Sequence, residues 1–247
     1  MKKSHEGRVA VVTGSARGIG QAIAIALAEN GASLALLDVD PATETAELVR
    51  KAGAEVIEVK TDVTSQQAWE AAAAAVKSRF GRADILVNNA GIYPFVALEE
   101  LSYEVWSRVM KINLDGPFLG TKAFLPLMKA QNWGRIVNLS SASVWTETPG
   151  FVHYIASKMG VIGLTRALSN ELGRYNIAVN AVAPSVTNTP GTSMAPDEMK
   201  RAVWSRQPIA RFGQPADLVG PILFLTSEAS GFVTGQTLVV DGGLVKH

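Results

Sequence analysis

The chain has 247 residues, of which 47% are hydrophobic and 18% are charged, and its formal net charge is +1. This length and composition suit one globular domain with a large core, and the near-zero charge favours a small-molecule substrate over nucleic acid or an anionic membrane. The chain has no cysteine, which excludes disulfides and thiolate catalysis, and its three histidines are too widely separated to suggest a metal site.

Short runs rich in β-branched residues alternate with longer segments rich in Ala, Leu and Glu along the whole sequence. This alternation predicts βαβ units and a parallel sheet. The runs are almost continuously apolar, as in strands that helices cover on both faces, so we expect an α/β, doubly wound, Rossmann-type fold with a seven-stranded parallel sheet in one domain, 1–247. The expected strands are Arg8 to Thr13, Ser33 to Asp38, Glu55 to Lys60, Asp84 to Asn88, Arg135 to Ser140, Ile177 to Ala183 and Thr237 to Val240.

A glycine-rich loop follows the first expected strand and precedes a helix expected from about Gln21 to Asn30. It contains Gly14, Gly18 and Gly20 in the spacing G-x-x-x-G-x-G. Glycines allow a phosphate to approach the backbone, and the start of a helix offers free N–H groups, so a pyrophosphate site is expected here. The spacing differs from the common G-x-G-x-x-G pattern, and an ordinary strand-to-helix turn is the alternative.

An acidic residue, Asp38, ends the second expected strand. A carboxylate there can accept hydrogen bonds from the ribose hydroxyls of NAD and would repel the additional phosphate of NADP. Arg17 in the glycine loop argues for NADP, but we expect Asp38 to decide the preference in favour of NAD, because close unit charges interact by about 1 kcal/mol or more even when well screened. The alternative for Asp38 is a turn residue before Pro41.

Two further features concern catalysis. A long helical pattern runs from about Tyr103 to Gln131 and contains Asn113, whose amide can distort a helix; an ordinary polar helix residue is the alternative. Tyr154 and Lys158 share one face of a later helix, so the ammonium is expected to lower the pKa of the phenol and make it a general acid or base. Such pairs are common on solvated helices. Ser141 follows the fifth expected strand and lacks the G-x-S-x-G setting of a serine hydrolase.

With these motifs assembled, the chain resembles the short-chain dehydrogenase/reductase family from Val9 to Gly243. The resemblance implies that Tyr154 exchanges the proton of an alcohol, that Lys158 also holds the nicotinamide ribose, and that Ser141 donates to the substrate oxygen. It implies that Asn113 carries a water linking Lys158 to solvent. The implied cofactor-binding residues are Gly14, Arg17, Gly18, Ile19, Gly20, Asp38, Asp62, Val63, Asn89, Gly91, Tyr154, Lys158, Pro184 and Thr187.

Within this family the sequence is most similar to NAD-dependent alcohol dehydrogenases of the 1-phenylethanol type, through Gly91-Ile92-Tyr93-Pro94, Ala183-Pro184-Ser185 and the ending Lys246-His247. This similarity implies a 1-arylethanol/aryl ketone pair as substrate, and the family resemblance implies a homotetramer. The segment 188–211, which contains several Pro residues and a Gly, is the expected mobile lid. The expected substrate-binding residues are Ser141, Tyr93, Trp145, Tyr154 and Val186. No apolar run suits a signal peptide or a membrane span, so we expect a cytoplasmic protein.

Two alternatives remain open at this stage. One is a 3-oxoacyl-thioester (acyl carrier protein) reductase of the same family, which would use NADPH. The other is a nucleotide-sensing or scaffold protein without catalysis, which the complete set of Asn113, Ser141, Tyr154 and Lys158 disfavours. The sequence also departs from the family at Ser185, where glycine is usual, so the loop after the sixth strand is expected to follow a different path.

Overall fold

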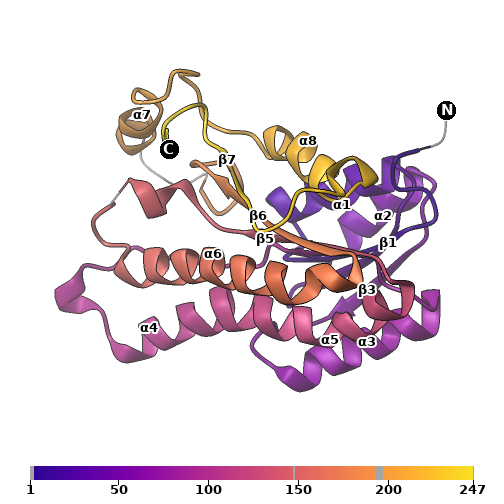
Figure 1. Cartoon of the computed structure of the whole chain (residues 1–247). Coiled ribbons are helices and arrows are strands. Elements are labelled where there is room, and N and C mark those ends of the chain that lie inside the picture. The colour runs from indigo at the N-terminus through magenta and orange to yellow at the C-terminus, as the bar shows by residue number, and fades with distance from the viewer. Residues whose placement is uncertain (1–2, 147, 193–196, 247) are drawn as a thin grey trace.

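The computed structural model describes residues 3–146, 148–192 and 197–246. Seven parallel strands form one sheet in the order β3-β2-β1-β4-β5-β6-β7, with helices on both faces (Figure 1). The predicted fold class is therefore confirmed. The strands are β1 (Val9–Thr13), β2 (Ser33–Asp38), β3 (Val56–Lys60), β4 (Ile85–Asn88), β5 (Gly134–Leu139), β6 (Ile177–Pro184) and β7 (Thr237–Val240).

The central strands are buried on both faces, as their continuous apolar sequences predict. Every residue of β1, β4 and β5 is buried, because helices cover both faces of the sheet. β1 pairs with β2 on one side, with Val9 opposite Ser33, and with β4 on the other, with Ala10 opposite Ile85. The order of the strands reverses between β1 and β4, and ligands of doubly wound sheets bind outside the carboxyl ends of the strands at such a point.

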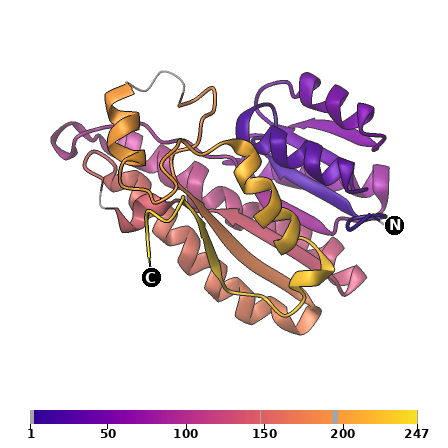
Figure 2. The same ribbon diagram turned by 90° about the horizontal axis from the view of Figure 1, so that it is seen from above.

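Two helical layers enclose two hydrophobic cores. On one face α1, α2 and α8 pack over Ala10, Val12 and Leu34, and on the other α3 and α5 pack over Val11 and Ile136 (Figure 2). The helices are α1 (Gly18–Glu29), α2 (Thr43–Lys51), α3 (Gln66–Phe80), α4 (Tyr103–Met110), α5 (Gly116–Gln131), α6 (Val152–Leu172), α7 (Asp197–Trp204) and α8 (Pro215–Leu225). No helix among the described residues is long and apolar enough to cross a membrane.

The long helix expected from Tyr103 to Gln131 is present but is not regular. A π-helical segment, Lys111–Asp115, separates α4 from α5, and the fully buried Asn113 lies at its centre. Such segments are rare and frequently lie at functional sites. The distortion predicted at Asn113 is therefore found.

Candidate active site

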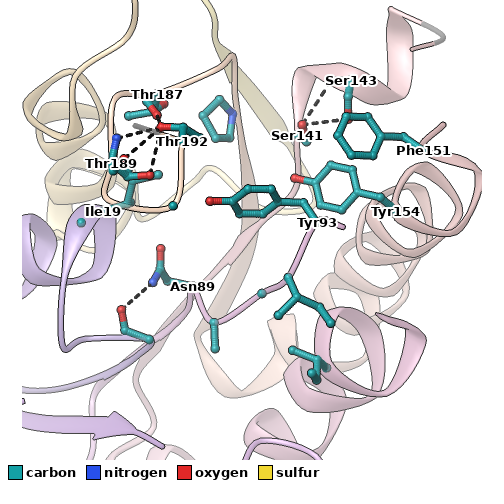
Figure 3. Close-up of a pocket in the computed structure, with 18 of the residues that line it drawn as sticks. Ile19, Asn89, Tyr93, Ser141, Ser143, Phe151, Tyr154, Thr187, Thr189 and Thr192 are labelled. Carbon is teal, nitrogen blue, oxygen red and sulfur yellow. Dashed lines mark hydrogen bonds between the residues drawn. The ribbon is translucent and has the colours of Figure 1, made fainter. Parts of the chain in front are cut away.

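A cavity of about 1420 Å³ lies at the carboxyl edge of the sheet (Figure 3). Its walls come from the loops after β1 to β6, which is where the switch in strand order places a ligand. Most of the residues predicted for the site line it: Gly14, Arg17, Gly18, Ile19, Asp38, Asp62, Val63, Asn89, Gly91, Tyr93, Ser141, Tyr154, Pro184, Val186 and Thr187. Four predicted residues do not line it: Gly20, Asn113, Trp145 and Lys158.

The glycine loop forms the floor of the dinucleotide half of the cavity. Gly14 and Gly18 have φ of +62° and +63°, a conformation that favours glycine. The amide of Asn89 donates to the carbonyls of Thr13 (2.9 Å) and Gly14 (3.1 Å), which ties the end of β4 to this loop. α1 begins at Gly18, so its first N–H groups are free to bind a phosphate.

Gly20 does not line the cavity, but it allows α1 to pack closely against the glycine loop. A Cβ at this position would overlap the carbonyl oxygen of Gly14 and the side-chain amide of Asn89. The first turn of α1 thus lies directly against the loop that a pyrophosphate would occupy. Only glycine permits this approach, which fits the dinucleotide that the loop would hold.

Gly20→Ala should weaken dinucleotide binding at least about tenfold, because the loop and α1 must separate to make room for the methyl group. Fluorescence titration with NADH measures the dissociation constant. Gly163→Ala is the matched control, since Gly163 is also helical and a Cβ there would have no neighbour within 4 Å. Equal affinities of wild type and Gly20→Ala would contradict the packing argument.

Asp38 holds the glycine loop and also faces the cavity. Its Oδ2 accepts from the backbone N–H of Ala16 (2.9 Å), and its Oδ1 accepts from the N–H of Asp40 (3.1 Å). The bond from Ala16 links β2 to the phosphate-binding loop. The bond from Asp40 closes the local turn that the sequence offered as the alternative role of Asp38. Arg17 lies 3.7 Å from the carboxylate of Asp40, and both side chains are exposed.

The catalytic candidates Ser141, Tyr154 and Lys158 come together, but their electrostatics differ from the prediction. Burial raises the pKa of Tyr154 to about 12, and the neighbouring hydroxyl of Ser141 lowers it only in part. Lys158 Nζ lies 5.8 Å from the centre of the Tyr154 ring and donates to the carbonyl of Leu139 (2.7 Å). The expected lowering of the phenol pKa by Lys158 is thus not found in this structure, because burial dominates and the ammonium is directed elsewhere.

The buried ammonium of Lys158 has a cost to the fold. Burial lowers the pKa of Lys158 from 10.5 to about 8, so the unfolded chain binds more protons between these pH values and the free energy of unfolding rises with pH across them. We expect the free energy of unfolding of the wild type minus that of Lys158→Met to increase by about 3 kcal/mol from pH 8 to pH 10.5. Denaturant titrations at each pH measure it. Lys122→Met, at an exposed lysine, should show no such trend, and a flat difference for Lys158 would refute the effect of burial.

Asn113 fixes the backbone next to the catalytic group. Its Oδ1 accepts from the N–H of Ile92 (2.9 Å), and its Nδ2 donates to the carbonyl of Ile92 (2.9 Å) and to Ser157 Oγ (3.1 Å). A Cβ at Gly91 would lie 3.2 Å from Asn113 Oδ1 and 3.4 Å from Lys158 Nζ. The π-helical turn therefore delivers an amide that holds the loop after β4 close to Lys158. The water implied for Asn113 stays a prediction.

Aromatic rings surround Tyr154 in the other half of the cavity. The ring centres of Tyr93 and Phe151 lie 6.2 Å and 5.3 Å from that of Tyr154, and Phe95 packs on Phe151 at 5.5 Å. Trp145, which we expected in this wall, does not line the cavity, whereas Phe151 does. The sequence offered a signal for Phe151, because it lies three residues before Tyr154 in an aromatic cluster.

The segment after β6 closes over the glycine loop. Thr192 Oγ1 donates to the carbonyl of Thr187 (2.6 Å) and accepts from the N–H of Thr189 (2.9 Å), which makes a compact turn. Thr189 lies next to Gly18, and a Cβ at Gly191 would overlap the hydroxyl of Tyr93. The predicted lid over 188–211 begins with this turn, and its residues 193–196 lie outside the described residues.

Ser185 fits its position without strain. The described non-glycine residues with positive φ are Asn132 and Asn176, so Ser185 does not need the freedom of a glycine. Its N–H donates to the carbonyl of Val240 (3.2 Å), and its hydroxyl donates to Gln207 Oε1 (3.0 Å). The serine thus adds a link between β6 and the segment that follows α7.

Comparison with known proteins places this geometry in a family. A protein-family model described as enoyl-(acyl carrier protein) reductase matches residues 14–245. The chain is 40% identical over 240 residues to the (2S)-[(R)-hydroxy(phenyl)methyl]succinyl-CoA dehydrogenase subunit BbsD of Thauera aromatica, with 96% of each chain covered. It is 40% identical over 245 residues to a 3-oxoacyl-[acyl-carrier-protein] reductase of Thermotoga maritima, covering 97% of this chain and 98% of the relative.

A solved structure agrees in detail. A protein described as a short-chain alcohol dehydrogenase from Sinorhizobium meliloti superposes with a TM-score of 0.93 at 35% identity, over 99% of this chain and 98% of that one. A dinucleotide crevice beside a serine, a tyrosine and a lysine defines an oxidoreductase that uses a nicotinamide cofactor. The chain belongs to the short-chain dehydrogenase/reductase family.

Proposed function

We propose that this protein interconverts a secondary alcohol and a ketone with NAD(H), and that the pair is a 1-arylethanol and its aryl ketone. The observation that carries this proposal is the aromatic wall that Tyr93, Phe95 and Phe151 form beside the ring of Tyr154. A flat, uncharged aryl group suits such a wall, and a few hydroxyl groups suffice to orient its oxygen.

The preference for NAD rests on charge at the end of β2. Asp38 lies where an adenosine ribose would be held, and Asp40 places a second carboxylate close by. A 2'-phosphate would meet both negative charges. Arg17, in the glycine loop, lies within reach of the carboxylate of Asp40, which weakens the attraction of Arg17 for a 2'-phosphate.

The residues of the chain would perform the proton chemistry. In ketone reduction Tyr154 gives its hydroxyl proton to the ketone oxygen, and Ser141 donates a hydrogen bond to the same oxygen as negative charge develops there. In alcohol oxidation the tyrosine takes the proton back. Lys158, whose ammonium donates to the carbonyl of Leu139, would hold the nicotinamide ribose, as the family resemblance implies, and a bound nicotinamide would supply or accept the hydride.

A second candidate is a 3-oxoacyl-thioester reductase that uses NADPH. Three cations without ion-pair partners among the described residues, Arg108, Lys111 and Arg206, line the same cavity, and they would suit the phosphate of a pantetheine-bearing substrate. The 3-oxoacyl-[acyl-carrier-protein] reductase of Thermotoga maritima is also 40% identical to the chain. This candidate differs from the first in both its substrate and its dinucleotide.

Steady-state kinetics separate the two candidates. The purified protein is assayed by NADH or NADPH absorbance with acetophenone-type ketones and with 3-oxoacyl thioesters. We expect the highest kcat/KM with an aryl ketone and NADH. Turnover of thioesters with NADPH alone would reject the first candidate in favour of the second.

We also propose that the protein is a homotetramer that acts in the cytoplasm without a nucleic-acid or membrane partner. Exposed apolar side chains at β7, at α8 and in the connection between them suit contact with a second copy: Phe224, Phe232 and Leu238. Analytical ultracentrifugation tests this assembly. A monomer at micromolar concentration would exclude it.

A further inference from the structure

Ser143 lies beside the catalytic group and has no role in the mechanism described so far. It belongs to a single 3-10 turn, Ala142–Trp145, that follows β5, and it lines the cavity. Its Oγ donates to Ser141 Oγ (2.9 Å), and its backbone N–H donates to the same atom (3.2 Å) (Figure 3). Two donors from one residue therefore converge on the oxygen of Ser141.

The two bonds from Ser143 use the whole capacity of the Ser141 hydroxyl to accept hydrogen bonds. A serine hydroxyl can accept two hydrogen bonds and donate one. Both acceptor positions of Ser141 are taken by Ser143, so the hydroxyl proton remains as its only further capacity. Ser141 lowers the pKa of the Tyr154 phenol, which is the effect of a hydroxyl that donates toward the phenol oxygen, and its proton is free for that role.

We propose that Ser143 is a positioning residue that directs the hydroxyl proton of Ser141 toward Tyr154 and the substrate oxygen. The proposal rests on the alcohol and ketone chemistry proposed above. A donor fixed before the substrate arrives does not need to reorient as charge develops on the substrate oxygen, which is the condition for efficient stabilisation of an oxyanion.

The direction of the bond also affects the acidity of Tyr154. Donation from Ser141 favours the phenolate, whereas acceptance by Ser141 would favour the neutral phenol. Without the Ser143 hydroxyl, one lone pair of Ser141 is free to accept from Tyr154. The other titratable groups around Tyr154 are Lys158, Tyr93 and His153, and His153 donates to the carbonyl of Pro94. None of these contacts involves Ser143.

Kinetics provide the first test. Ser143→Ala should lower kcat about tenfold with an unchanged affinity for NADH, and Ser143→Thr should retain most of the activity because it keeps the hydroxyl. In a Ser141→Ala background, Ser143→Ala should cause no additional loss. A further loss in that background would show that Ser143 acts independently of Ser141 and would overturn the proposal.

The second test needs no turnover and so remains valid if the proposed substrate is wrong. The chain has four tyrosines, so labelling their Cζ carbons with ¹³C gives few NMR signals, and Tyr154→Phe assigns the one of interest. Ser143→Ala should raise the pKa of Tyr154 above its wild-type value. An unchanged or lowered pKa would refute the assigned direction of the hydrogen bond, whatever the substrate.

Discussion

Replacing Tyr154 with phenylalanine should lower kcat about a thousandfold while leaving dinucleotide binding intact. The change removes the phenol hydroxyl that exchanges the proton in the proposed mechanism and whose pKa Ser141 lowers. The phenyl ring keeps its packing against Phe151 and Tyr93, so the fold should persist. Stopped-flow or steady-state absorbance at NADH saturation measures the loss.

The matched control is Tyr175→Phe. Tyr175 follows α6, away from the cavity, and its ring lies beside the cations of Lys129 and Arg174. Its variant should keep the wild-type kcat. Wild-type turnover by a folded Tyr154→Phe protein would refute the mechanism, because the mechanism assigns the proton exchange to the hydroxyl of Tyr154.

Asp38→Asn should shift the dinucleotide preference by about a hundredfold. The amide keeps an oxygen that can accept from the N–H of Ala16, so the loop should hold, but the negative charge is lost. We expect kcat/KM with NAD to fall about tenfold, because hydrogen bonds to a charged acceptor are stronger, and kcat/KM with NADP to rise about tenfold, because repulsion of the 2'-phosphate is relieved.

Asp40→Asn provides the comparison for Asp38. Asp40 belongs to the same turn, but in the part of the chain that the structure describes its carboxylate lies near Arg17 and is not bonded to the glycine loop backbone. Its variant should change the preference less, since it keeps the carboxylate nearest the phosphate-binding loop. Equal kcat/KM values for NAD and NADP in the wild type would show that the charge at Asp38 does not select the cofactor.

The sheet could be predicted closely because its signal is local. Buried parallel strands must be apolar on both faces, and the second and seventh strands were predicted with the observed bounds, Ser33–Asp38 and Thr237–Val240. The glycine loop and Asp38 could also be placed, since residues after parallel strands share one edge of the sheet. Gly20 shows the limit, because its constraint comes from Asn89, far away in the sequence.

Other properties of the site depend on contacts that spacing does not reveal. The i, i+4 spacing places Lys158 near Tyr154 but does not report that the ammonium donates to Leu139 or that burial dominates the phenol pKa. The 3-10 turn after Ser141 brings Ser143 back onto its oxygen, whereas Trp145 does not line the cavity. A tight turn of this kind has no strong sequence signature.

The π-helical turn at Lys111–Asp115 constrains how this protein can be redesigned. Deleting one residue there would restore regular hydrogen bonding and remove the wider turn that presents the side chain of Asn113. Asn113 would then lose both backbone groups of Ile92. A variant designed only for thermostability would gain a regular, more stable helix but would no longer hold the loop after β4 beside Lys158. The number of residues in this turn must therefore be kept in any redesign that is to remain active.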